Sequence, residues 1–131
     1  MDCTVVVVTH GQLAKQLVAT CEMLIGKQEN VLPVDFMPGE NLESLIKKLA
    51  GIIEDNKVSG PLMMVVDMFS GSPFNASTWF VKNRPETKIV AGVNVPMLVN
   101  ILLERQEAES FDELVEMAVD VGQNAVKSLQ N

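Results

Sequence analysis

The stretch Val5-Val6-Val7-Val8-Thr9-His10-Gly11 decides how this chain folds. Four consecutive β-branched residues are typical of a strand buried on both faces, and such strands belong to parallel sheets covered by helices. Gly11 allows a tight turn, and helical periodicity begins at Gln12. His10, the only histidine of the chain, is therefore predicted at the carboxyl end of a central strand, where open α/β sheets bind ligands.

The rest of the chain alternates predicted strands with predicted helices, which indicates an α/β fold with a doubly wound parallel sheet and helices on both faces. Pro33 cannot donate to a sheet ladder, so the second strand is expected at an edge. The expected strand order is 2-1-3-4, which places Asp67 opposite His10. The further strands are expected at residues 31–36, 62–67 and 88–93, and the helices at 12–25, 42–53 and 72–83, after Asn94 and after Ser110.

Length and composition indicate one domain covering residues 1–131, with no linker or repeat. The net charge of -7 and the absence of a Lys/Arg cluster argue against nucleic acid or an anionic membrane as a partner. No apolar run approaches the roughly 20 residues of a membrane-spanning helix. We expect a cytoplasmic protein in which Cys3 and Cys21 are buried, reduced thiols.

His10 and Asp67 together predict a reactive histidine. A carboxylate that accepts a hydrogen bond from one ring nitrogen fixes the tautomer and leaves the other nitrogen free as a nucleophile. A lone histidine is more often structural, and Asp67 could equally cap the loop that follows its strand. The expected position of both side chains at one crevice favours the functional interpretation.

The stretch Gly71-Ser72-Pro73-Phe74-Asn75 is open to two interpretations. Ser72 before a proline is typical of a helix cap. The same helix start, together with the one at Gly11, would point free N–H groups and a hydroxyl into the His10 crevice, which would bind an anion. Ser72, His10 and Asp67 could also suggest a hydrolytic triad, but the serine lacks the G-x-S-x-G context.

Two further points concern possible ligands. One histidine and two scattered cysteines cannot supply a plausible metal-ligand set. Four apolar residues are expected in loops near His10, where they would either form a docking surface for proteins or fold onto the core. These residues are Met37, Met68, Phe69 and Met97.

Short motifs are spread in order along the whole chain. They comprise residues 9–11 with Leu13-Ala14, and residues 22–26, 38–41, 71–76 after Asp67, 92–98 and 110–114. Together they resemble enzyme IIA of the mannose family of the bacterial phosphoenolpyruvate-dependent sugar phosphotransferase system. Two departures are visible: Ser70 stands where the family usually has a glycine, and Phe69 stands where a tryptophan is common.

The resemblance implies that His10 accepts a phosphoryl group from the histidine phosphocarrier protein and passes it to enzyme IIB, which serves the membrane components IIC and IID. Asp67 would orient His10, and Ser72 with Gly11 would contact the phosphoryl group. No cofactor or metal is implied. The resemblance also implies a homodimer that exchanges a short antiparallel strand within residues 125–129. The alternative is a regulatory phosphocarrier module, such as the phosphotransfer subunit of dihydroxyacetone kinase.

Overall fold

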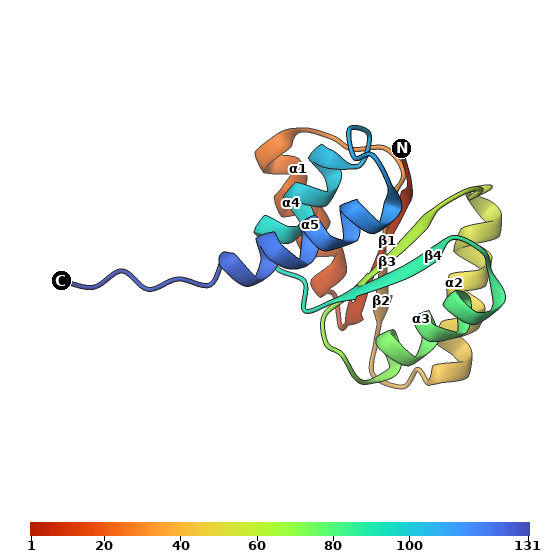
Figure 1. Ribbon diagram of the computed structural model, residues 1–131. Helices are drawn as coiled ribbons and strands as arrows, with labels where there is room; N and C mark the ends of the chain where they lie inside the picture. The colour runs from red at the N-terminus through yellow and green to blue at the C-terminus, as the bar shows by residue number, and fades with distance from the viewer.

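The computed structural model describes residues 1–131 and contains one parallel sheet between two layers of helices (Figure 1). The strand order is β2-β1-β3-β4, as predicted. The strands are β1 (Thr4–His10), β2 (Val31–Phe36), β3 (Leu62–Val66) and β4 (Thr87–Ala91). The helices are α1 (Leu13–Ile25), α2 (Leu42–Asp55), α3 (Ser72–Asn83), α4 (Val95–Glu104) and α5 (Phe111–Asn124).

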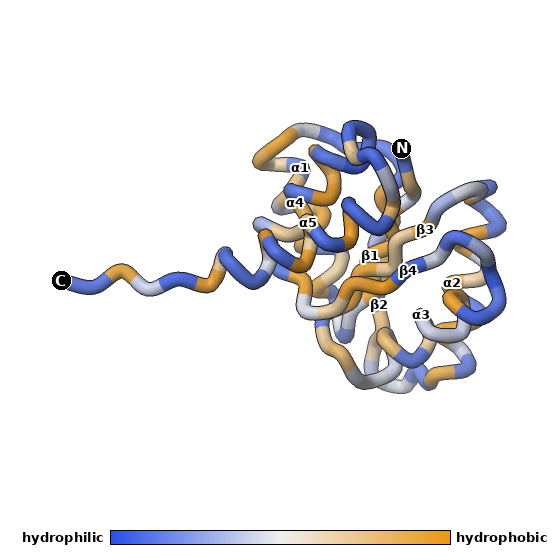
Figure 2. Tube along the Cα trace, viewed as in Figure 1, coloured by the Kyte–Doolittle hydropathy of each residue, from blue (hydrophilic) through white to orange (hydrophobic).

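Strand β1 lies between β2 and β3, and its residues from Val5 to Thr9 are buried. Alternate side chains point to opposite faces of the sheet, so Val5 and Val7 pack against α1, α4 and α5, whereas Val6 and Val8 pack against α2 and α3. Figure 2 shows the hydrophobic strands between the two helical layers. Each fully buried valine stabilises the fold by about 1.5–3 kcal/mol relative to an exposed one.

The predicted position of β2 at an edge of the sheet is confirmed. Pro33 pairs in register with Val7, and the missing proline N–H is tolerated because no further strand lies beyond β2. The fourth strand ends at Ala91 rather than Val93, because Gly92 takes a φ of +85° and turns the chain toward α4. No helix of the protein combines the length and the apolar character that a membrane crossing requires.

The end of the chain differs from the compact body. Helix α5 stops at Asn124, and residues 125–131 form no helix or strand and extend away from the rest of the molecule (Figure 1). The strand expected within residues 125–129 is therefore absent from the single chain. The tail leaves two apolar side chains in solvent, with Val126 82% and Leu129 100% exposed.

Candidate functional site

His10 and Asp67 meet at the carboxyl edge of the sheet, as the strand order predicts. Asp67 Oδ2 lies 2.9 Å from His10 Nδ1 and also accepts a hydrogen bond from the His10 backbone N–H at 3.2 Å. The other carboxylate oxygen, Oδ1, is buried and has no hydrogen-bond partner in the chain. Both hydrogen bonds that the Asp67 carboxylate accepts therefore come from His10.

The two side chains of the pair differ in exposure. The Asp67 side chain is 13% exposed, whereas the His10 side chain is 44% exposed. A carboxylate only accepts hydrogen bonds, so the Nδ1 atom that faces it carries the proton and Nε2 keeps its lone pair. This geometry would suit Nε2 to act as a nucleophile.

Gly71 lies against the reactive side of the imidazole ring. A Cβ atom built on Gly71 would fall 2.9 Å from His10 Cε1 and 3.0 Å from Nε2, closer than real Cβ contacts allow. Its backbone, at φ 89° and ψ 177°, lies in a region that only glycine adopts readily. The sequence analysis placed Gly71 in a motif but missed this contact. The one indication of this contact in the sequence was that Gly71 directly precedes Ser72.

The prediction that Ser72 caps the following helix is wrong. The N-cap of α3 is Gly71, and Ser72 is already the first helical residue. The hydroxyl of Ser72 therefore does not occupy the capping position, and the residue follows directly on the glycine that contacts His10. The predicted extent of this helix, residues 72–83, is confirmed.

Thr9 and Gly11 hold His10 at the end of its strand. The buried Thr9 hydroxyl accepts a hydrogen bond from the Ala14 N–H at 2.8 Å and so stabilises the start of α1, a role that the sequence analysis missed. Gly11 makes the expected turn at φ +59°. Its N–H donates to the Phe36 carbonyl at 2.7 Å, so this donor is already engaged within the chain.

The apolar residues expected in loops near His10 divide into two groups. Met37, Met68 and Phe69 are exposed, Phe69 at 79%, so they do not fold onto the core. The assignment of Met97 to a loop is wrong, because it belongs to α4 and is 3% exposed within the core. The N-terminal cap of that helix lies at Asn94, which directs Met97 inward.

The two cysteines offer no competing nucleophile. Cys3 and Cys21 are free and buried, as predicted. Burial raises the pKa of the Cys3 thiol to about 11, against a smaller lowering by the Arg105 guanidinium, and burial also raises the pKa of Cys21. Both thiols are therefore protonated at neutral pH, and a thiol reacts poorly in that form.

Comparison with known proteins identifies the family of the chain. Residues 4–119 match the EIIA-man family, described as the fructose IIA component of the sugar phosphotransferase system (PTS). The chain belongs to this family. The PTS mannose-specific EIIAB component of Escherichia coli strain K12 is 45% identical over 99% of the chain, which spans 40% of that relative's length. The PTS sorbose-specific EIIA component of Lacticaseibacillus casei is 33% identical over 95% of the chain and 89% of its own length.

A solved structure shows the same fold as this EIIA-man chain. The mannose/sorbose-specific IIA subunit from Enterococcus faecalis superposes with a TM-score of 0.91, covers 100% of the chain and 97% of its own, and is 24% identical. The chain is therefore a IIA component of the mannose family of the phosphotransferase system. The resemblance drawn from the sequence motifs is thereby confirmed.

Proposed function

We propose that His10 carries the phosphoryl group on Nε2, accepting it from the histidine phosphocarrier protein and passing it to enzyme IIB. The observation that carries the proposal is the 2.9 Å contact between Asp67 Oδ2 and His10 Nδ1, which leaves only Nε2 free on an exposed ring. In the transfer, the Nε2 lone pair forms a bond to phosphorus while the bond from phosphorus to the donor histidine breaks. Such transfer needs positioning and charge stabilisation more than covalent machinery.

The surrounding residues would act on the phosphoryl group as it arrives. Ser72 would donate its hydroxyl, and the N-terminus of α3, whose cap Gly71 lies beside His10, would favour the negative charge. Gly71 leaves space beside Nε2, where any side chain would intrude. Gly11 would contribute through the turn, because its own N–H is already bonded to Phe36.

The test of this function is stepwise transfer with purified proteins. The protein should become labelled from phosphoenolpyruvate when enzyme I and the histidine phosphocarrier protein are present, and the label should be acid-labile as expected for phosphohistidine. It should then move to a IIB protein of the mannose family. The alternative, a regulatory module related to the dihydroxyacetone kinase phosphotransfer subunit, would accept the label but pass none to any IIB. A IIB that receives the label excludes this alternative.

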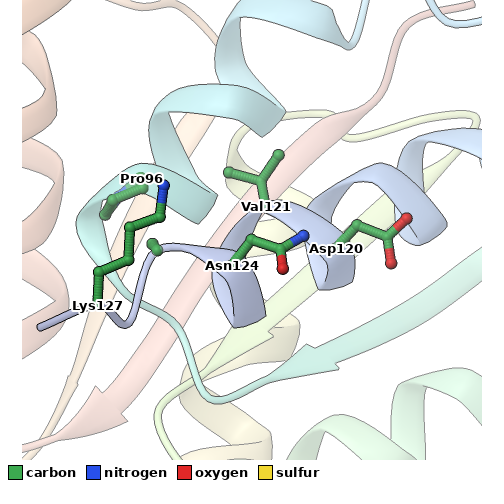
Figure 3. Close-up of a pocket in the computed structure, with 6 residues that line it drawn as sticks. Pro96, Asp120, Val121, Asn124 and Lys127 are labelled. Atoms are coloured by element: carbon green, nitrogen blue, oxygen red, sulfur yellow. The ribbon is translucent and has the colours of Figure 1, made fainter.

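The quaternary structure belongs to the same proposal: a homodimer in which a short segment within residues 125–129 of each chain pairs as an antiparallel strand with the other chain. Two features support it. Strand β4 is a free edge of the sheet, and the tail carries exposed Val126 and Leu129 away from its own body. At the root of the tail, α4, α5 and the tail line an open surface hollow of about 470 Å³ (Figure 3), with Pro96, Asp120, Val121, Asn124, Ala125 and Lys127 around it.

Removal of residues 125–131 is expected to convert the dimer into a monomer of about half the mass, while the helices and strands remain. The measurement is light scattering coupled to gel filtration, and the intact subunit weighs 14.3 kDa. A shorter truncation that removes only Gln130 and Asn131 keeps both apolar residues and should stay dimeric. A dimer that survives loss of the whole tail would contradict the exchange.

A further inference from the structure

The segment between β2 and α2 forms one wall of the site around His10. Residues 36–40 line, together with His10 and Gly11, an open pocket of about 300 Å³. Phe36 packs edge-on against the His10 ring, with centroids 5.9 Å apart and planes at 81°. Residues 37–39 are exposed, so this wall has little hydrophobic packing to hold its shape.

One ion pair ties this wall to the rest of the fold. The Glu40 carboxylate accepts a hydrogen bond from the Met37 N–H at 2.8 Å and lies 2.7 Å from the Lys48 ammonium. Lys48, on the second turn of α2, also donates to the Asp35 carbonyl at 2.8 Å. The pair, which we call the Glu40–Lys48 clamp, connects the end of β2, the exposed turn and α2 through partly buried, charge-assisted hydrogen bonds.

The clamp is formed throughout the neutral pH range. The hydrogen bond from Lys48, and next the Met37 N–H, lower the pKa of Glu40 from its ordinary value of 4.5. A lowered pKa in the folded state means that the interaction contributes fully above pH 4.5 and is lost only as the pH falls through the folded value. Near neutral pH the Glu40 carboxylate therefore carries the charge that the clamp requires.

The clamp is not needed to cap the start of α2. Asn41 and Ser44 already form a reciprocal capping box there, with the Ser44 N–H donating to Asn41 at 2.8 Å and the Asn41 N–H to Ser44 at 3.0 Å. The helix therefore has its own cap. The Glu40 and Lys48 side chains are not needed to cap the helix. They order the exposed turn of residues 37–39 beside His10.

We propose that Glu40 and Lys48 are positioning residues that hold the 36–40 wall in the shape on which the phosphoryl donor and acceptor proteins dock. The inference rests on the proposed carrier function of His10. Neither side chain hydrogen-bonds to the imidazole ring, whose tautomer Asp67 fixes, so loss of the clamp should weaken docking and leave the transfer step unchanged. A loop that is ordered before binding spares the complex the free-energy cost of ordering it.

The test is the rate of phosphorylation as a function of donor concentration, compared between the wild type, Glu40→Ala and Lys48→Ala. We expect the half-saturating donor concentration to rise about three- to tenfold, the range given by the ordering cost of one side chain, with a limiting rate within about twofold. The half-saturating concentration of the double variant should not exceed that of the more affected single variant, because either substitution alone already breaks the ion pair. Glu40→Gln, which keeps an acceptor for the Met37 N–H, should recover part of the loss.

Glu43→Ala and Lys47→Ala are the matched controls, since both residues are exposed on α2 and belong to no ion pair of the structure. Half-saturation equal to these controls, or a fall in limiting rate at unchanged half-saturation, would overturn the positioning role. Amide hydrogen exchange of residues 37–40, which needs no donor, should accelerate in Glu40→Ala and not in Glu43→Ala. A wild-type chain that takes no phosphoryl group contradicts the carrier function itself, so the two failures are distinct.

Discussion

Replacing His10 by alanine should abolish phosphorylation of the protein by the histidine phosphocarrier protein. The substitution removes the only imidazole of the chain, and both buried thiols are protonated at neutral pH. No other nucleophile of comparable reactivity lies beside Asp67. The measurement is incorporation of label from phosphoenolpyruvate with the general carriers present, and we expect the variant at the level of a sample without carrier.

The fold of the His10→Ala variant should survive, because the His10 side chain is 44% exposed. Most substitutions at exposed positions change the free energy of unfolding by less than about 0.5 kcal/mol, although this one also removes a hydrogen bond to Asp67. An unfolding curve near that of the wild type would show that lost labelling reflects lost chemistry. Label that persists in a folded variant would place the phosphoryl acceptor on another residue.

Replacing Gly71 by alanine should reduce transfer by about 100-fold or more, the scale of a reacting group displaced by about 1 Å. The new methyl group would fall 2.9 Å from His10 Cε1 and 3.0 Å from Nε2, the atom proposed to bear phosphorus. Either the ring or the turn must move, and both changes disturb the approach of the donor. The initial rate of labelling at saturating donor measures this effect.

Gly26→Ala is the matched control for backbone strain. Gly26, at the end of α1, has φ 87° and ψ 170°, close to the 89° and 177° of Gly71, but a Cβ there meets nothing within 4 Å. Both variants should lose a similar free energy of unfolding, about 1–3 kcal/mol. Only Gly71→Ala should lose transfer. Equal rates in the two variants would show that the contact with His10 is irrelevant to the chemistry.

The sequence predicted those features that follow from element order. Four valines fixed a central strand, Pro33 placed the second strand at the edge, and the resulting order 2-1-3-4 brought Asp67 beside His10. Because the carboxyl ends of parallel strands share one edge of the sheet, a contact between residues 57 positions apart could be inferred without coordinates. The family motifs added the identity of the transferred group.

The contacts that depend on the path of a turn could not be predicted. The observed N-cap of α3 is Gly71, one residue before the predicted Ser72. A difference of one residue lies within the ordinary uncertainty of helix ends, but it means that the Ser72 hydroxyl does not occupy the capping position. The approach of Gly71 to the ring depends on the conformation of the 67–71 turn, which propensities do not determine. The Glu40–Lys48 clamp joins residues of ordinary surface type, and their proximity follows from the angle at which α2 leaves its loop.

The central claim, that Asp67 directs the phosphoryl group to one nitrogen of His10, can be tested on the phosphorylated protein itself. Phosphorus–nitrogen coupling in protein labelled with ¹⁵N-histidine identifies the bonded ring atom directly, and the chain has only one histidine to assign. The 2.9 Å contact between Asp67 and Nδ1 predicts coupling to Nε2, with Nδ1 still protonated. Coupling to Nδ1 would contradict the orientation of the ring on which the proposed mechanism depends.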